Sequence, residues 1–157
     1  MKQELIQMFK EISILISKRS TCCRRQVGSL IVRDGRIIST GWNGVSKKQG
    51  HCIDYFKFIV QTENLNPIEY YNSKEFYDAH GKFSELKEIH SELNAILHSK
   101  QDLTNTQLFC TLSPCLNCSK AILASGIIEV YYIEDYDRDP FGGINLLKEN
   151  NIKVFKI

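Results

Sequence analysis

Short apolar runs of strand length alternate with helical segments along most of this chain. The runs at 27–32 and 36–41 (VGSLIV and RIISTG) flank Asp34-Gly35, a dipeptide typical of a hairpin turn. Three further runs are separated by segments of helical character: 107–112, 127–133 and 151–157. Strands that alternate with helices after an opening hairpin favour a mixed sheet. We therefore expect an α/β protein with three α/β/α layers, in which helices cover both faces of a five-stranded sheet.

The first 20 residues have the spacing of an amphipathic helix. Apolar side chains recur there three and four positions apart, and we assign this stripe to core packing: Leu5, Met8, Phe9, Ile12, Leu15 and Ile16. Gly126 is a typical stop signal for a preceding helix. The remaining helices are expected at 85–98, 114–125 and 143–150.

Size and composition are those of an ordinary globular protein. The 157 residues fit one domain spanning 1–157, with 43% hydrophobic and 24% charged residues. No apolar run approaches the roughly 20 residues of a membrane span, and the N-terminal segment carries acids unlike a signal peptide. We therefore expect a cytoplasmic protein without a membrane partner. The net charge of +2 is weaker than that of most polynucleotide binders, so no nucleic-acid partner is expected.

Six cysteines stand at positions 22, 23, 52, 110, 115 and 118. In a reducing compartment, metal binding or burial of the thiol is favoured over disulfides. Cys110 lies in an apolar run and is expected in the core. Cys22 and Cys23 are adjacent, so their side chains diverge and are not expected to bind one metal together.

The segment TLSPCLNC (111–118) places two cysteines near the start of an expected helix. Pro114 suits the first turn, which puts Cys115 and Cys118 on one face. The helix dipole and a metal would both favour their thiolate forms. A C-x-x-C motif alone is also compatible with a redox pair, half of a structural zinc ribbon, or chance.

A second motif, His90-Ser91-Glu92, resolves part of that ambiguity. Helices on either side of strand 107–112 can converge at one edge of the sheet, which brings His90 to the two cysteines. One nitrogen and two sulfur ligands leave a fourth position open, as in catalytic zinc sites. Glu92 would then stand beside the metal rather than on it and carry a proton.

Together these residues resemble the cytidine deaminase superfamily, whose pattern is H-x-E followed by P-C-x-x-C. Four segments resemble deoxycytidylate (dCMP) deaminases of the phage and viral kind: STCCRRQVGSLIV (20–32), DGRIISTGWNG (34–44), HSELNAI (90–96) and TLSPCLNCSKAILASGI (111–127). The resemblance implies a cytidine-deaminase-like fold and hydrolysis of dCMP to dUMP and ammonia, which supplies dUMP for thymidylate synthesis. It also implies that zinc activates the attacking water, that Glu92 transfers its proton, and that a viral chain works in the host cytoplasm.

The resemblance also implies how the nucleotide is held. Asn43 matches a residue that contacts the sugar hydroxyl, and Tyr136 matches a tyrosine of the nucleotide site. Arg24 and Arg25 lie where a monophosphate or a neighbouring subunit could be met. Ser91 stands where the family usually has Ala, close to the base, so its hydroxyl could alter the local hydrogen bonds.

Regulation and assembly are implied in the same way. In relatives, a loop that corresponds here to Asn43, Gly44, Lys47 and Lys48 binds dCTP with Mg²⁺ as activator, or dTTP as inhibitor. Ser46 replaces a common Pro in that loop, which loosens it. Family members are commonly hexamers, so a homo-oligomer is expected.

The stretch 42–83 is rich in Asn, Tyr, Lys and Ser and has only local apolar patches. A structureless loop of that length in a compact domain needs something that holds it. A second, structural zinc is expected for this role, and phage-type relatives have a similar arrangement. Its ligands would be Cys22, Cys52, His80 and Glu88, with His51 as an alternative fourth ligand; surface His and Glu beside two buried cysteines is the competing interpretation.

Three other functions use some of the same residues. A zinc deaminase that acts on tRNA adenosine or another polynucleotide shares the metal core, and so does one that acts on a free nucleoside, a base or a riboflavin precursor. A non-catalytic zinc module is the third. Glu92 separates the last from the others, because a structural zinc site has no use for that carboxylate.

Overall fold

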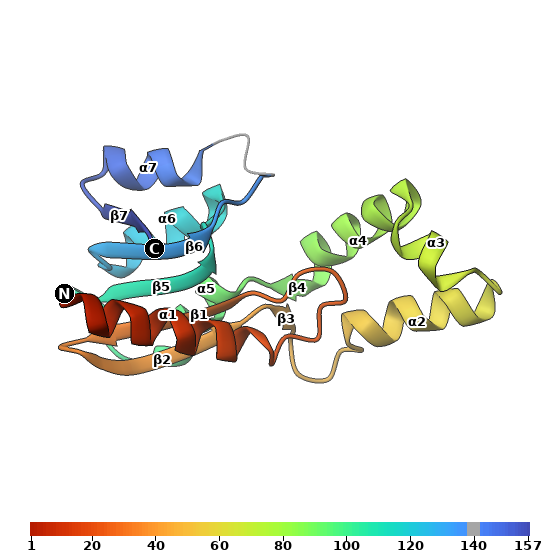
Figure 1. Cartoon of the computed structure of the whole chain (residues 1–157), viewed down its shortest axis with the longest axis horizontal. Coiled ribbons are helices and arrows are strands. Elements are labelled where there is room, and N and C mark those ends of the chain that lie inside the picture. The colour runs from red at the N-terminus through yellow and green to blue at the C-terminus, as the bar shows by residue number, and fades with distance from the viewer. Residues whose placement is uncertain (138–141) are drawn as a thin grey trace.

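A five-stranded mixed sheet forms the centre of the computed structural model, which describes residues 1–137 and 142–157 (Figure 1). The strand order is β2-β1-β5-β6-β7. β1 runs antiparallel to both β2 and β5, whereas β5, β6 and β7 are parallel. The predicted sheet is confirmed, and its strands are β1 (Gly28–Arg33), β2 (Arg36–Trp42), β5 (Gln107–Leu112), β6 (Glu129–Glu134) and β7 (Lys153–Lys156).

Helices cover both faces of this sheet. α1 (Gln3–Ser17) packs on one face, and α5 (Ser91–Ser99), α6 (Leu116–Ser125) and α7 (Gly143–Glu149) pack on the other. Alternate residues of a strand point to opposite faces. In β5, Phe109 joins the core under α1, whereas Leu108 and Cys110 join the core under the other three helices. The three-layer prediction and the burial of Cys110 are thus confirmed.

The apolar stripe of α1 is narrower than predicted. Phe9 is buried, and Leu5, Ile12 and Ile16 pack around it. Met8 and Leu15 were wrongly assigned to the core, because 41% and 61% of their surfaces are exposed. The positions that α1 buries most deeply besides Phe9 are small: Ser13 and Ser17, whose backbones lie directly against Gly28 of β1.

The stretch 42–83 is not a loop. It contributes β3 (Gly44–Val45), α2 (Cys52–Thr62), α3 (Pro67–Tyr71) and most of α4 (Lys74–Lys87). These three helices, here called the helical lobe (residues 52–87), project from one end of the sheet (Figure 1). The local apolar patches are its own core: Cys52, Phe56, Val60, Tyr70, Phe76 and Phe83. None of the helices in the described part of the chain is long and apolar enough to cross a membrane.

Two helices begin later than the sequence predicts. The helix expected at 85–98 is divided by β4 (Glu88–Ile89), which pairs antiparallel with β3, and His90 is the extended N-cap residue of α5. The helix expected from Pro114 begins at Leu116, with Cys115 as its extended N-cap residue. Both residues therefore project from helix starts, where the backbone N–H groups and the helix dipole favour negative charge.

Gly41 lets α5 approach the sheet closely. A Cβ atom at this position of β2 would overlap the backbone of Ser91 and Ala95, two rigid positions of α5. We expect Gly41→Ala to lower the free energy of unfolding by about 1–3 kcal/mol, because overpacking displaces backbone. Denaturant unfolding measures this change. Gly50→Ala is the matched control, since nothing lies within 4 Å of an added Cβ there, and equal stability of the two variants would contradict the prediction.

Candidate active site and metal clusters

His90, Cys115 and Cys118 converge at the starts of α5 and α6, and we call them the His90 cluster. Their ligand atoms lie within 4.8 Å of one another. His90 Nδ1 is 3.5 Å from Cys115 Sγ and 3.4 Å from Cys118 Sγ. Nitrogen and sulfur ligands at 2.0–2.3 Å from a tetrahedral zinc would be about 3.6 Å apart. The spacing of these three atoms therefore fits a shared zinc ion.

The ionisation of the two thiols in this cluster is unequal. Hydrogen bonds from Cys118 and His90 lower the pKa of Cys115 to about 4. The same contact with Cys115, together with burial, raises the pKa of Cys118. The hydrogen bond to Cys115 raises the pKa of His90 to about 9. The thiolate form is therefore favoured at Cys115, and a bound divalent cation would also favour the thiolate of Cys118 and a neutral imidazole.

Glu92 lies in the first turn of α5, with only 4% of its surface exposed. Burial raises the pKa of its carboxyl group above the usual value. The Ser91 hydroxyl donates a hydrogen bond to Glu92 Oε2 at 2.9 Å, and Ser91 Oγ lies 2.7 Å from Ser29 Oγ of β1. A buried carboxyl group with a raised pKa beside a metal-ligand cluster has the properties of a general acid or base.

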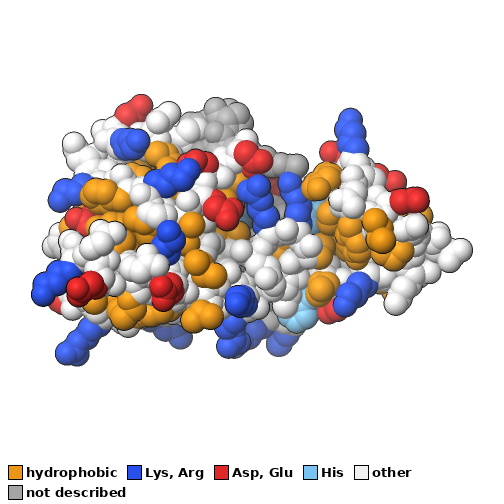
Figure 2. All heavy atoms as spheres, viewed as in Figure 1, with side chains coloured by type: hydrophobic (Ala, Val, Ile, Leu, Met, Phe, Trp, Pro, Cys, Tyr) orange, Lys and Arg blue, Asp and Glu red, His pale blue; other side chains and the backbone are white. Residues whose placement is uncertain are grey.

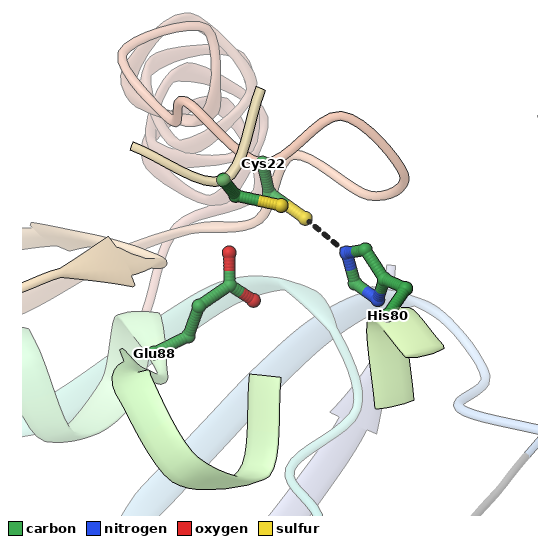
Figure 3. Close-up of side chains that lie close together, drawn as sticks. Cys22, His80 and Glu88 are labelled. Atoms are coloured by element: carbon green, nitrogen blue, oxygen red, sulfur yellow. Dashed lines mark hydrogen bonds between the residues drawn. The ribbon is translucent and has the colours of Figure 1, made fainter. Parts of the chain in front are cut away.

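A second group of ligand atoms, here called the His80 cluster, connects the helical lobe with β4 and with the segment between α1 and β1. It contains Cys22, Cys52, His80 and Glu88, whose ligand atoms lie within 4.8 Å of one another. Figure 3 shows Cys22, His80 and Glu88 turned toward each other, with Cys22 Sγ 3.2 Å from His80 Nε2. The structure brings together the four residues that the sequence suggested.

The chemistry of the His80 cluster fits a cation. Glu88 Oε1 is buried and has no hydrogen-bond partner among the described residues, so a positive charge beside it would satisfy it. The hydrogen bond with Cys52 and burial raise the pKa of Cys22, and coordination would remove that thiol proton. His51, the alternative ligand, is exposed and makes a 3.2 Å hydrogen bond with Thr21, outside this cluster.

One cavity of about 790 Å³ is lined by residues of both clusters. Glu92, the predicted proton carrier, lines it, and so do the predicted substrate-binding residues: Arg24, Arg25, Asn43, Ser91 and Tyr136. Lys47 and Lys48, predicted to meet an effector, are exposed and lie outside this lining. In the space-filling view, Lys and Arg side chains gather where the helical lobe meets the rest of the molecule (Figure 2).

The two arginines at the cavity are held by different partners. Arg24 lies over the ring of Tyr77 of α4, with its guanidinium carbon 4.8 Å from the ring centroid. Arg25 makes a 3.3 Å ion pair with Asp137, whose side chain is largely exposed. Arg25 Nη1 is buried and lacks a hydrogen-bond partner among the described residues. That N–H group can donate a hydrogen bond to an anion in the cavity without losing an existing bond.

Asn43 and Tyr136 also have defined surroundings. Asn43 is buried, and its side-chain oxygen accepts a hydrogen bond from the Val27 N–H at 2.8 Å while its amide donates to the Arg25 carbonyl at 2.9 Å. Each amide atom keeps one further hydrogen-bonding capacity. The Tyr136 backbone N–H donates a hydrogen bond to Ser113 Oγ at 2.7 Å. This bond fixes the backbone of Tyr136 at the cavity, just after the end of β6.

Three contributors to the site have no signal in the sequence. Ser29, Tyr77 and Asp137 come from β1, α4 and the segment after β6, and each acts through a residue far away in the chain. None belongs to a motif with functional spacing. Only the arrangement of the elements brings Ser29 under Ser91, or the lobe residue Tyr77 under Arg24.

Comparison with known proteins agrees with this geometry. Residues 3–134 match the model of the cytidine and deoxycytidylate deaminase zinc-binding region. The deoxycytidylate deaminase of Enterobacteria phage T4 is 35% identical over 94% of this chain and 86% of its own length. The dCMP deaminase of cyanophage S-TIM5, solved with dCMP and dUMP, is 28% identical with a TM-score of 0.74 over 100% of this chain and 99% of its own.

A more distant structure shows the fold alone. The diaminohydroxyphosphoribosylaminopyrimidine deaminase/reductase of Thermotoga maritima is 20% identical, with a TM-score of 0.64 over 98% of this chain and 36% of its own. The family match covers both motifs of the His90 cluster, and the T4 relative matches nearly the whole chain. This chain belongs to the zinc-binding cytidine and deoxycytidylate deaminase family.

Proposed function

We propose that this chain hydrolyses dCMP to dUMP and ammonia. One observation carries the proposal: the His90 cluster opens into the same cavity as the buried carboxyl group of Glu92 and the two arginines. A structural metal site needs neither a buried acid nor cations beside it. The similarity to phage deoxycytidylate deaminases supports dCMP as the substrate.

The chain's own residues divide the work. His90, Cys115 and Cys118 would hold zinc, which supplies an activated water near neutral pH. Glu92 takes a proton from the attacking water, delivers it to N3 of the pyrimidine, and then assists the departure of ammonia. Because burial raises the pKa of Glu92, the carboxyl group can both hold and release that proton.

Nucleotide binding falls to the other residues that line the cavity. We assign the sugar hydroxyl to Asn43, whose amide is already oriented by the backbone of residues 25–27. Tyr136 lines the same cavity, and we assign it a contact with the nucleotide. Arg24 and Arg25 are assigned to the monophosphate, because they supply positive charge and Arg25 Nη1 has no hydrogen-bond partner in the described chain.

If Arg25 binds the phosphate, its removal should lower the selectivity of the enzyme for dCMP over deoxycytidine. We expect Arg25→Ala to raise KM for dCMP by at least about tenfold, because a charge-assisted hydrogen bond to phosphate is lost. Deoxycytidine lacks the phosphate, so its kcat/KM should change little. Steady-state rates with both substrates measure the ratio. Arg33→Ala, at the end of β1 and bonded to the Asp102 carbonyl, is the control, and unaltered selectivity in Arg25→Ala would refute the assignment.

The proposed reaction is tested by ammonia release from purified protein. The substrates are dCMP, CMP, dCTP, deoxycytidine and a tRNA, each assayed with and without zinc in the buffer. Turnover of dCMP above the others supports the proposal. Preference for a nucleoside or tRNA would retain the deaminase chemistry and change the substrate, whereas no ammonia from any of them would overturn the function.

Regulation and assembly are proposals of the same kind. We propose that dCTP with Mg²⁺ activates, and dTTP inhibits, through the loop with Asn43, Gly44, Lys47 and Lys48, since both lysines are exposed and follow the buried Asn43 closely in the sequence. We also propose a homo-oligomer, with a hexamer as the expected form. The exposed apolar side chains of Met8 and Leu15 on α1 support this proposal, because a neighbouring subunit could cover them. Assays with each effector and light scattering test the two proposals.

A further inference from the structure

The carboxyl group of Glu92 is connected to the sheet by two buried hydroxyl groups. Ser91 Oγ donates to Glu92 Oε2 at 2.9 Å, and Ser29 Oγ of β1 lies 2.7 Å from Ser91 Oγ. Both serines have no exposed surface, and Glu92 is 4% exposed. The three side chains form one continuous hydrogen-bonded row with almost no exposed surface.

The direction of these hydrogen bonds follows from the donors present. An ionised carboxylate only accepts, so the single hydroxyl proton of Ser91 is committed to Glu92. Ser91 must then accept from Ser29, which makes Ser29 the donor at the far end of the row. A buried hydroxyl without a partner is costly, so each serine holds the next group in place.

We infer that Ser29 and Ser91 are positioning residues, which fix the Glu92 carboxylate so that Oε2 is held and Oε1 meets the reacting atoms. This inference rests on the proposed deaminase function. Ser91 therefore acts through Glu92 rather than on the nucleotide, although it lines the cavity.

Position matters here because proton transfer requires close alignment. A catalytic group must lie within hydrogen-bonding reach of the proton it moves, and a displacement of about 1 Å can cost about 100-fold in rate. Without the Ser91 hydroxyl, the Glu92 carboxyl group loses a hydrogen bond that holds its rotamer. The chemical step should slow, while nucleotide binding through Arg25 and Asn43 should persist.

The expected result is a selective loss of kcat. Ser91→Ala should lower kcat for dCMP about tenfold, the equivalent of one hydrogen bond to a charged group, with KM within twofold of wild type and zinc content unchanged. Ser29→Ala should lower kcat in the same direction. The double variant should be no slower than Ser91→Ala, because Ser29 acts only through Ser91.

Ser39→Ala is the matched control. Ser39 is also a buried serine of the sheet that holds α5, with Oγ donating to the Ala95 carbonyl at 2.6 Å, but it has no link to Glu92. It should lose stability in denaturant unfolding and keep wild-type kcat. Wild-type kcat in Ser91→Ala, or additive losses in the double variant, would overturn the inference. Absence of turnover in the wild-type protein would instead overturn the proposed function.

Discussion

Glu92→Gln should abolish turnover and leave the metal in place. The substitution keeps the size of the side chain but removes its capacity to take a proton, so kcat for dCMP should fall by about 10³-fold. The His90 cluster does not include Glu92, so the zinc content should match wild type. Stopped assays of ammonia release together with elemental analysis of the same sample measure both effects.

Two other variants serve as controls for Glu92→Gln. His90→Ala should lose activity and zinc together, because it removes a predicted ligand. Glu149→Gln, at the end of α7, should retain both. Wild-type turnover in Glu92→Gln would contradict the assignment of Glu92 as the proton carrier, and loss of its zinc would make Glu92 a ligand instead.

His80→Ala should remove one of two zinc ions and destabilise the protein. We expect two zinc ions per wild-type chain and about one in the variant, with Tm lowered by roughly 10 °C, because a structural metal contributes directly to folding. The four residues of the His80 cluster come from the segment after α1, from α2, α4 and β4, so its metal would fasten the helical lobe. Metal analysis and thermal unfolding monitored by circular dichroism measure the two effects.

His98→Ala is the control for this substitution. His98 lies in the last turn of α5, where it is exposed and contacts the Asn94 carbonyl. That variant should keep both metals and the wild-type Tm. A wild-type protein with one zinc per chain would falsify the second site, and the four side chains would then be a hydrogen-bonded cluster only.

The sheet was predictable because each strand and its flanking turn carry local signals. Asp34-Gly35 marks the hairpin, and both residues adopt positive φ angles in the structure. The apolar run of β5 likewise predicts a strand that is buried on both faces, and Leu108, Phe109 and Cys110 are all buried. The chain's three-layer fold therefore required only short-range information combined with the rules of strand connection.

The helical lobe was missed because its helical stripe is interrupted by a polar residue. In α4 the buried positions are Phe76, His80 and Phe83, which have helical spacing, but His80 breaks the apolar pattern. His80 is buried because its ring points toward Cys22 and the other members of the His80 cluster. A predicted metal ligand thus obscures the helix that carries it, although the proposed ligand set itself was predicted from family resemblance.

The start of α5 could not be predicted for a different reason. Residues 85–98 read as one helix, yet Glu88 and Ile89 pair with Val45 and Gly44. That pairing depends on a partner more than 40 residues away, which no local pattern encodes. The same limit applies to Ser29, whose contact with Ser91 joins residues 62 positions apart.

The two-residue strand β4 has a consequence for the relation between the two clusters. Glu88 belongs to one cluster and His90 to the other, with only Ile89 between them on extended backbone. A displacement of Glu88 therefore also displaces His90, which belongs to the other cluster. We therefore expect the two clusters to be coupled, so that a movement of the helical lobe changes the alignment of His90 with Cys115 and Cys118.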